Sequence, residues 1–186
     1  MLHSPAFTKL SLLDTYKEMK KLVTKGKAKS LGISNTNLQQ LSDLYPSYPI
    51  AIFEGIYNFE CKIYEDIGVL DYCKAHNIAF VCYQPLRRNR TANRNYSLLV
   101  TLAEKYHKTQ NQILLNRIIK EKGLLPLVKT SNPERIQENI ASLNFTLEKA
   151  DYQQLNDFRS EEFDSVKIDR NNQGGISIDQ LANQFE

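Results

Sequence analysis

The stretch that decides the fold is LLPLVKTSNPERIQEN, Leu124 to Asn139, where a short apolar run passes through a polar turn into a helix. The apolar part is too short for a helix and contains Pro126, which suits a brief barrel strand or an edge strand. Asn132 is a good N-cap, and Pro133 suits the first helical position. The stretch therefore predicts a strand followed directly by a helix.

The predicted start of this helix has the features of an anion-binding site. Ser131 and Glu134 offer a second capping register, and either register leaves backbone N–H groups unpaired in the first turn. Lys129 and Arg135 flank those groups, so donors and positive charge would hold an anion together, with phosphate as the natural guest. The residues alone leave equally open a capped surface helix that carries two solvated cations.

Composition and charge exclude several classes of protein. The 186 residues, 41% hydrophobic, can bury a sizeable core in one domain or in a large part of one. A net charge of +3 is too small to indicate a nucleic-acid partner. No apolar run approaches the roughly 18 residues of a membrane span. The start of the sequence lacks the pattern of an export signal, so we expect a cytoplasmic protein without a membrane partner.

The cysteines and the acidic residues do not predict a metal site. Cys61, Cys73 and Cys82 have neither metal-ligand nor CxxC spacing, and we expect reduced, partly buried thiols with a structural role. Residues 169–180 faintly resemble a calcium loop, but the twelfth position is Gln180 instead of Glu. The metal prediction is therefore none.

Apolar spacing and capping signals predict that helices and strands alternate along the chain. The predicted helices are 10–25, 37–45, 64–76, 97–107, 111–122, 133–143 and 148–159, and the predicted strands are 28–33, 50–53, 78–82 and 124–128. Thr36 with Gln39 predicts one capping box, and Thr109 with Gln112 another. Residues 87–95, rich in Arg and Asn, are interpreted as a solvated loop, with contact to a phosphate-bearing ligand as the alternative.

This alternation requires a parallel sheet with crossover helices. An open sheet and a closed eight-stranded barrel both fit, but the strands are short and none is followed by GxGxxG, which favours the barrel. A complete barrel takes about 250 residues. Only four or five strands can be counted here, so the predicted fold class is α/β, a partial (β/α)8 TIM barrel.

Five segments in order, LHSP, KGKAKSLGISN, DYCKAHNIAFVCYQPL, LAEKYHKTQNQILLNRII and VKTSNPERIQENI, resemble the aldo-keto reductases over residues 1 to about 158. The resemblance implies an NAD(P)H-dependent oxidoreductase that reduces an aldehyde or ketone, a small-molecule carbonyl substrate, to an alcohol. It also implies that residues 1–159 form the last four to five β/α units of the barrel. Residues 160–186 form a polar C-terminal tail without a matching motif.

The resemblance implies one catalytic residue and contacts to the nicotinamide half of the cofactor. His3 matches the histidine that orients and polarises the substrate carbonyl. Ser34 and Asn35 match the pair that hydrogen-bonds the nicotinamide carboxamide. Tyr83 matches the aromatic residue that stacks on the ring, and Leu86 lies in the loop that crosses the pyrophosphate.

The resemblance further implies a clamp for the adenosine phosphate. Lys129, Thr130, Arg135 and Asn139 match the clamp, and Glu138 lies beside them. Lysine together with arginine at a helix start favours the extra phosphate of NADP(H) over NAD. This expectation agrees with the anion site inferred from the residues alone.

Three positions depart from the family pattern. Glu54 stands where the family has Gln to help hold the carboxamide, and a carboxylate cannot donate a hydrogen bond as an amide does. Gln84 and Arg87 replace the small Ser and Gly of the loop over the pyrophosphate. Arg87 is the residue that could instead supply charge to the ligand.

The family's general-acid tyrosine and its lysine and aspartate partners precede the histidine strand, and no residue of 1–186 matches them. One hypothesis is a truncated reductase polypeptide whose N-terminal half is supplied elsewhere. The alternative is a non-catalytic dinucleotide-binding half-barrel remnant that self-associates through the unpaired edge near Leu31. We therefore expect little turnover from this chain alone.

Overall fold

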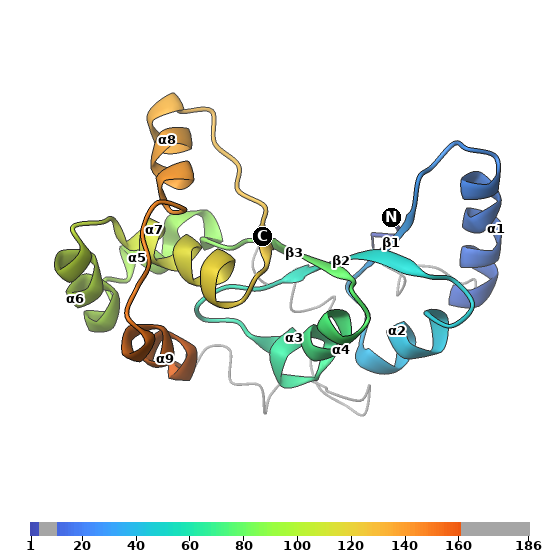
Figure 1. The fold of residues 1–186 in the computed structure, drawn as a ribbon, viewed down its shortest axis with the longest axis horizontal. Coiled ribbons are helices and arrows are strands. Elements are labelled where there is room, and N and C mark those ends of the chain that lie inside the picture. The colour runs from blue at the N-terminus through green and yellow to red at the C-terminus, as the bar shows by residue number, and fades with distance from the viewer. Residues whose placement is uncertain (4–10, 161–186) are drawn as a thin grey trace. The chain divides into compact units, whose positions relative to one another are not determined.

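The computed structural model describes residues 1–3 and 11–160 of the chain. These residues form two compact units, and Figure 1 colours them by their position in the sequence. The first unit contains residues 1–55 and 63–81, and the second contains residues 56–62 and 82–160. Strands β2 and β3 begin in the first unit and end in the second, so each contributes to both.

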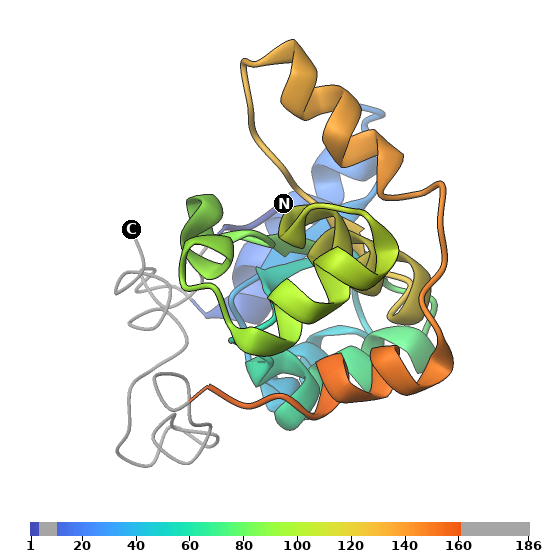
Figure 2. The same cartoon turned by 90° about the vertical axis from the view of Figure 1, so that its left-hand side faces the viewer.

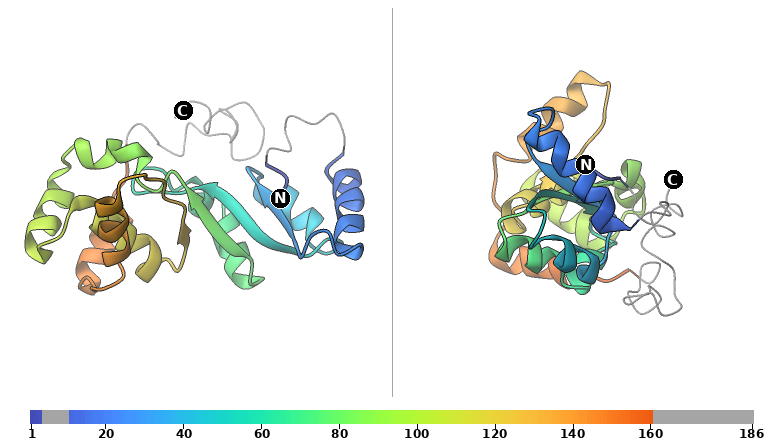
Figure 3. Two further views of the ribbon diagram at one scale, coloured as in Figure 1. Left: turned by 90° about the horizontal axis from the view of Figure 1, so that it is seen from above. Right: turned by 90° about the vertical axis from the view of Figure 1, so that its right-hand side faces the viewer.

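The strands form one sheet in the order β1-β2-β3-β4, with helices between successive strands, and β2 and β3 run alongside each other (Figure 3). From the N-terminus to the third strand the elements are α1 (Leu12–Thr24), β1 (Leu31–Ser34), α2 (Leu38–Leu44), β2 (Ile50–Ile56), α3 (Ile63–Asp66), α4 (Val69–Ala75) and β3 (Ala79–Tyr83). The fourth strand, β4 (Leu125–Pro126), comes later in the chain. β1 and β2 pair in parallel, and Leu2 makes a parallel bridge to Ile33. The topology confirms the predicted partial barrel.

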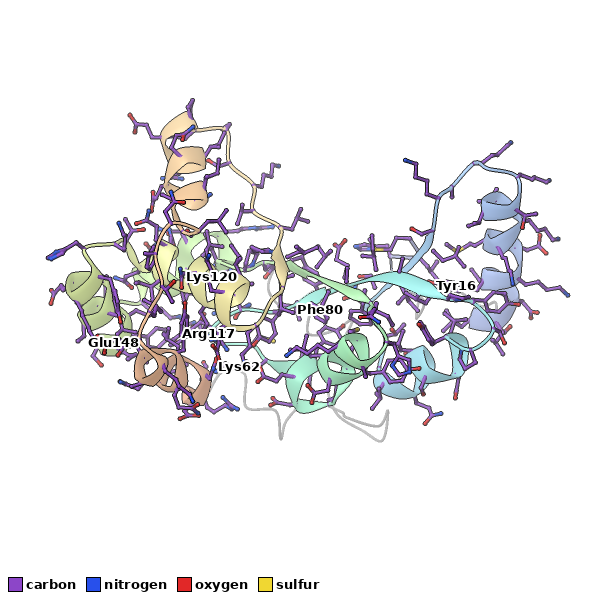
Figure 4. All side chains as sticks on the ribbon, in the orientation of Figure 1. Tyr16, Lys62, Phe80, Arg117, Lys120 and Glu148 are labelled. Atoms are coloured by element: carbon purple, nitrogen blue, oxygen red, sulfur yellow. The ribbon has the colours of Figure 1, made fainter. Side chains whose placement is uncertain are left out.

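Aromatic side chains hold the first unit together. Tyr16 of α1 is fully buried and its hydroxyl donates to the carbonyl oxygen of Gly32 at 2.7 Å, which fixes α1 on β1 (Figure 4). Phe53 of β2 lies 5.0 Å from Tyr64 of α3 and 5.3 Å from Phe80 of β3, measured between ring centroids. These three rings join the strands to α3 in one apolar core.

Gly55 in β2 has no room for a side chain. A Cβ atom at this position would lie 2.5 Å from Cε2 of Tyr64, whose ring is fully buried against Phe53. We expect Gly55→Ala to lower the free energy of unfolding of the first unit by about 1–3 kcal/mol, the usual cost of overpacking. Urea denaturation followed by circular dichroism measures this change. Ala51→Ser on the same strand is the control, and equal stability of Gly55→Ala and the wild type would contradict the prediction.

The helices of the second unit, light green to orange in Figure 2, pack around a core of aliphatic and aromatic side chains. Its further elements are η2 (Arg87–Asn89), α5 (Arg90–Asn93), α6 (Ser97–Tyr106), α7 (Gln110–Asn116), the π-helical η3 (Arg117–Glu121), α8 (Pro133–Ala141) and α9 (Lys149–Asp157). The core comprises Phe59, Leu99, Leu102, Ile113, Leu114, Leu147, Tyr152 and Leu155. Leu127, the residue after β4, donates its backbone amide to the carbonyl oxygen of Cys82 in β3 at 2.8 Å.

Two local predictions in the first unit are wrong in detail. The predicted helix 64–76 is divided into α3 and α4, because Gly68 takes the left-handed φ of 82° that glycine tolerates. The capping box of α2 is formed by Asn37 and Gln40 instead of Thr36 and Gln39. Asparagine is a better N-cap than threonine, which explains the shift by one residue.

Predictions for the second unit are confirmed at two caps and wrong elsewhere. Thr109 and Gln112 form the predicted box at α7, and Asn132 caps α8. The predicted helix 111–122 instead ends as α7 and continues as η3, because its last turns have π-helical hydrogen bonds. The predicted strand 124–128 is paired only at Leu125–Pro126, as expected for a segment with a proline.

The cysteine prediction is confirmed. Cys61, Cys73 and Cys82 are buried free thiols, and burial raises the pKa of Cys73 to about 12. Among residues 1–3 and 11–160, no group of three His, Cys, Asp or Glu side chains could hold a metal ion. None of the helices in this part of the chain is both long and apolar enough to cross a membrane. The weak calcium-loop pattern at 169–180 lies outside the described residues.

Candidate functional site

A cleft of about 1000 Å³ in the second unit collects most of the predicted phosphate contacts. Three segments line it: the loop after β3, the start of α7 and the stretch from β4 into α8. The lining residues are Gln84, Pro85, Leu86, Arg87, Arg88, Asn89, Ala92, Asn93, Asn95, Thr109, Gln110, Asn111, Leu127, Val128, Lys129, Thr130, Arg135, Glu138 and Asn139. Six predicted cofactor contacts are therefore brought together at one surface, and Tyr83 immediately precedes it.

The N-terminus of α8 differs from the expected anion site in one respect. The Asn132 side chain accepts from the amides of Glu134 at 2.8 Å and Arg135 at 3.3 Å, and Pro133 has no N–H. The amide of Ile136 donates to the Asn132 carbonyl oxygen. The backbone donors expected to bind an anion are thus already bonded. Side chains must supply the attraction at this end of the cleft.

The charged side chains at this end of the cleft are mainly cationic. Lys129 and Arg135 are exposed on the cleft wall, and Arg88 is exposed on the opposite lining segment. Glu138 opposes this charge, but its carboxylate accepts from the Thr109 hydroxyl at 2.5 Å. Glu138 thereby fastens α8 to the start of α7. The cleft carries more positive than negative charge, as a phosphate ligand requires.

The other predicted residues belong to the first unit, where hydrogen bonds connect three of them. Asn35 directly follows β1, has a left-handed φ of 56°, and donates through Nδ2 to the backbone oxygen of His3 at 3.1 Å. The Asn35 amide donates to the Glu54 carbonyl oxygen at 3.4 Å. Ser34 lies opposite Glu54 in the strand register, and its fully buried hydroxyl has no hydrogen-bond partner among residues 1–3 and 11–160. A buried unpaired hydroxyl fits the donor that a carboxamide ligand would need.

The interpretation of residues 87–95 as a solvated loop is wrong. The segment forms η2 and α5, and Arg87 is only 3% exposed because its Nη1 atom lies 2.7 Å from Oε2 of Glu60. The Arg87 charge is therefore paired with Glu60, and the hypothesis that Arg87 supplies charge to a ligand is not supported. Glu60 was missed, because its partners are 27 or more residues away and no local pattern marks it.

Two other buried cations have structural partners outside the cleft lining (Figure 4). The Lys62 ammonium donates to three carbonyl oxygens at the end of α9 and beyond it, at 2.6–3.2 Å. Arg117 donates to Oδ1 of Asn156 at 2.9 Å and to the Tyr57 hydroxyl at 3.1 Å. Both cations stabilise the C-terminal end of α9, where carbonyl groups are unpaired.

Two buried carboxylates make the second unit sensitive to acid. Burial would raise the pKa of Glu60, but hydrogen bonds from Thr91, Tyr96 and Arg87 outweigh it and lower the pKa below its usual value. Burial would likewise raise the pKa of Asp151, but hydrogen bonds from Lys105 and Tyr106 outweigh it and lower the pKa below its usual value. A pKa that is lower in the folded state stabilises the fold above the unfolded-state value, and this contribution is lost as pH falls through the folded-state value.

We therefore expect the urea midpoint of the second unit to fall as the pH is lowered from about 5 to about 3. The variant with Glu60→Gln and Asp151→Asn starts from a lower midpoint and loses less of it over the same range. Exposed Glu104→Gln and Asp157→Asn together serve as the charge-matched control. A wild-type midpoint that stays constant over this range would contradict the prediction.

The family model for the aldo/keto reductase family matches residues 1–160 of this chain. Aldose reductase B of Dictyostelium discoideum is 31% identical over 157 residues, which are 84% of this chain and 50% of the relative. The NADPH-dependent alpha-keto amide reductase of Saccharomyces cerevisiae is 30% identical over 164 residues, covering 81% of this chain and 52% of the relative. The chain thus spans about half the length of these relatives.

Solved structures show the same similarity. The aldose reductase of Schistosoma japonicum has a TM-score of 0.70 at 26% identity, over 80% of this chain and 48% of that one. The Bombyx mori aldo-keto reductase in complex with NADP has a TM-score of 0.69 at 26% identity, over 84% of this chain and 54% of that one. These similarities support the partial-barrel interpretation of the fold.

Proposed function

This chain belongs to the aldo/keto reductase family, and from this premise we propose that its cleft binds the phosphates of NADP(H) for the reduction of an aldehyde or ketone to an alcohol. The observation that carries the proposal is the set of side chains on one cleft wall. Lys129, Thr130, Arg135 and Asn139 line the cleft together, and Leu86 comes from the opposite segment. When bound, the cofactor would supply the hydride.

Taken by themselves, the predicted residues of the first unit suit a nicotinamide carboxamide. The buried Ser34 hydroxyl, which has no partner in the described part of the chain, would donate to the carboxamide oxygen. Glu54 cannot donate as glutamine does, but its carboxylate would accept from the carboxamide NH₂ group. Asn35 keeps its Nδ2 atom on the His3 carbonyl oxygen and would thus position the residue that meets the substrate carbonyl. Tyr83 would stack on the ring.

The proposed reaction also needs a proton donor, for which the chain has no assigned residue. In the resemblance described above, a tyrosine with lysine and aspartate partners precedes the histidine strand. The chain spans about half of its relatives, so we propose that further polypeptide, continuous with this chain or separate, supplies the other half of the barrel and the acid.

The surface of α8 fits such a completion. Ile136 and Ile140 of α8 and Leu143 in the turn after it follow one another at helical spacing and are 42%, 52% and 44% exposed. None of the residues of α8 is buried, although apolar residues at this spacing normally face a core. The proposed occupant of this face is the first part of the barrel, because strands of a closed barrel pair the last unit with the first.

We expect purified chain to give little or no NADPH consumption with a panel of aldehydes and ketones, and turnover to appear when the N-terminal half of a relative is added. General acid catalysis contributes about 10²- to 10⁴-fold, which sets the size of the gain. His3→Ala should abolish the restored turnover, whereas His107→Asn at the end of α6 should retain it. Sedimentation distinguishes a mixed complex from association of like chains.

Clear turnover by the chain alone, lost in His3→Ala, would contradict the need for a complementing half. Absence of saturable NADPH binding by both the chain and the mixed complex would instead contradict the cofactor proposal. The two results separate the question of completion from the question of the ligand.

A further inference from the structure

Glu60 is a buried carboxylate with four side-chain partners in the segment that lines the cleft. It is 3% exposed. Its Oε2 atom accepts from Arg87 at 2.7 Å and from the Thr91 hydroxyl at 2.6 Å. Its Oε1 atom accepts from the Tyr96 hydroxyl at 2.6 Å and lies 3.1 Å from Nη1 of Arg94. One side chain thus connects to residues spread over the whole segment 87–96.

This segment has a backbone that it would not keep unaided. Arg87, Arg88 and Asn89 are consecutive residues with left-handed φ angles of 47°, 54° and 71°. Such angles are unfavourable for an arginine, because its Cβ atom comes too close to the following carbonyl oxygen. Arg87 stands where the resemblance places a glycine, for which the same angle is free of this cost. The ion pair with Glu60 offsets the strain that the arginine introduces.

The conformation decides which side chains the segment presents to the cleft. Arg87 is held by Glu60, whereas Arg88 is exposed on the lining. Asn89 accepts from Nδ2 of Asn111 at 2.6 Å, which links the segment to the start of α7. The cleft lining therefore depends on a carboxylate that is not itself a lining residue.

We infer that Glu60 is a positioning residue of the cleft, whose ion pair with Arg87 holds residues 84–95 in the shape that receives the pyrophosphate of the cofactor. The inference rests on the proposed function for its ligand. It assigns Glu60 no contact with that ligand. Glu60 acts through the backbone of residues 87–91, because the two side chains that donate to its Oε2 atom, Arg87 and Thr91, lie at the two ends of this stretch.

The test compares two ligands in the variant Glu60→Gln. NADPH would engage both the segment 84–95 and the clamp of Lys129 and Arg135, whereas adenosine 2′-monophosphate would engage the clamp alone. We expect the dissociation constant of NADPH to rise about tenfold, equivalent to about 1.4 kcal/mol. That of adenosine 2′-monophosphate should change less than about twofold. Calorimetric titration measures both, and exposed Glu104→Gln is the control.

A second variant distinguishes positioning from a loss of the fold. Glu60→Gln leaves the Arg87 guanidinium buried without its carboxylate, which is costly. Replacing Arg87 by glycine in the same chain removes that charge and accepts the left-handed backbone. We expect the double variant to regain NADPH affinity to within about threefold of the wild type, since both sources of strain are gone.

Unchanged NADPH affinity in Glu60→Gln, or an equal loss for both ligands, would overturn the inference. If the wild type binds neither ligand, the proposed function fails, and amide hydrogen exchange decides the structural part separately. Faster exchange of residues 84–95 in Glu60→Gln, with α9 unchanged, supports the holding role of Glu60. Equal exchange rates in the two proteins would overturn it.

Discussion

Replacing both Lys129 and Arg135 by alanine is expected to raise the dissociation constant of NADPH by at least about 100-fold, because each charged hydrogen bond contributes about 1.5–3 kcal/mol. The dissociation constant of NADH, which lacks the extra phosphate, should change far less. The Asn132 side chain already accepts from the amides of Glu134 and Arg135, so these two donors cannot replace the lost cations. The two side chains should therefore account for most of the discrimination between the cofactors.

Fluorescence titration with each cofactor measures this prediction. Lys120→Ala with Lys149→Ala removes two positive charges from exposed positions outside the cleft lining, and we expect near-normal NADPH binding from it. An equal loss for NADPH and NADH would show that the alanines act on the fold or on general charge. Unchanged NADPH affinity would remove the clamp from the proposal.

Asn116→Ala is expected to lower the free energy of unfolding of the second unit by about 3–5 kcal/mol, because each buried polar group left unpaired costs about 1–3 kcal/mol. Asn116 is fully buried and its Nδ2 atom donates to the carbonyl oxygens of Ser142 and Phe145 at 2.8 and 2.7 Å. Its Oδ1 atom accepts from the Tyr152 hydroxyl at 2.6 Å. One amide thus joins α7 to the turn after α8 and to α9.

Urea denaturation at neutral pH measures this loss. Asn144→Ala, in the exposed part of the same turn, should change the free energy by less than about 0.5 kcal/mol. Tyr152→Phe removes the hydrogen bond to Asn116 at 2.6 Å and the one accepted from the Leu147 amide at 3.3 Å, and should cost about 1–3 kcal/mol. Equal stability of Asn116→Ala and Asn144→Ala would contradict the assignment of Asn116 as the connection between these elements.

The sequence predicts the fold best where short-range chemistry decides it. Asn132 and Pro133 define the start of α8, and Thr109 with Gln112 the start of α7, because capping involves residues two or three apart. The helix break at Gly68 was missed, since the apolar spacing continues across it. A left-handed residue changes the path of the chain without changing that pattern.

The candidate site divides in the same way. Motif positions predicted the cleft wall that holds Lys129 and Arg135, because the strand and the helix that carry them are adjacent in the chain. Glu60 could not be predicted, since its hydrogen bonds reach 27–36 residues along the sequence. Likewise, no sequence pattern predicts that the Ser34 hydroxyl is buried without a hydrogen-bond partner among the described residues.

The ion pair between Glu60 and Arg87 also has an evolutionary consequence. Losing the acid alone strands a buried guanidinium, and losing the arginine alone leaves a buried carboxylate with fewer donors. We therefore expect a sequence that changes only one of the two residues to be less stable than a sequence that keeps both or replaces both. We expect an acid at position 60 and an arginine at position 87 to be gained and lost together in the descent of this lineage.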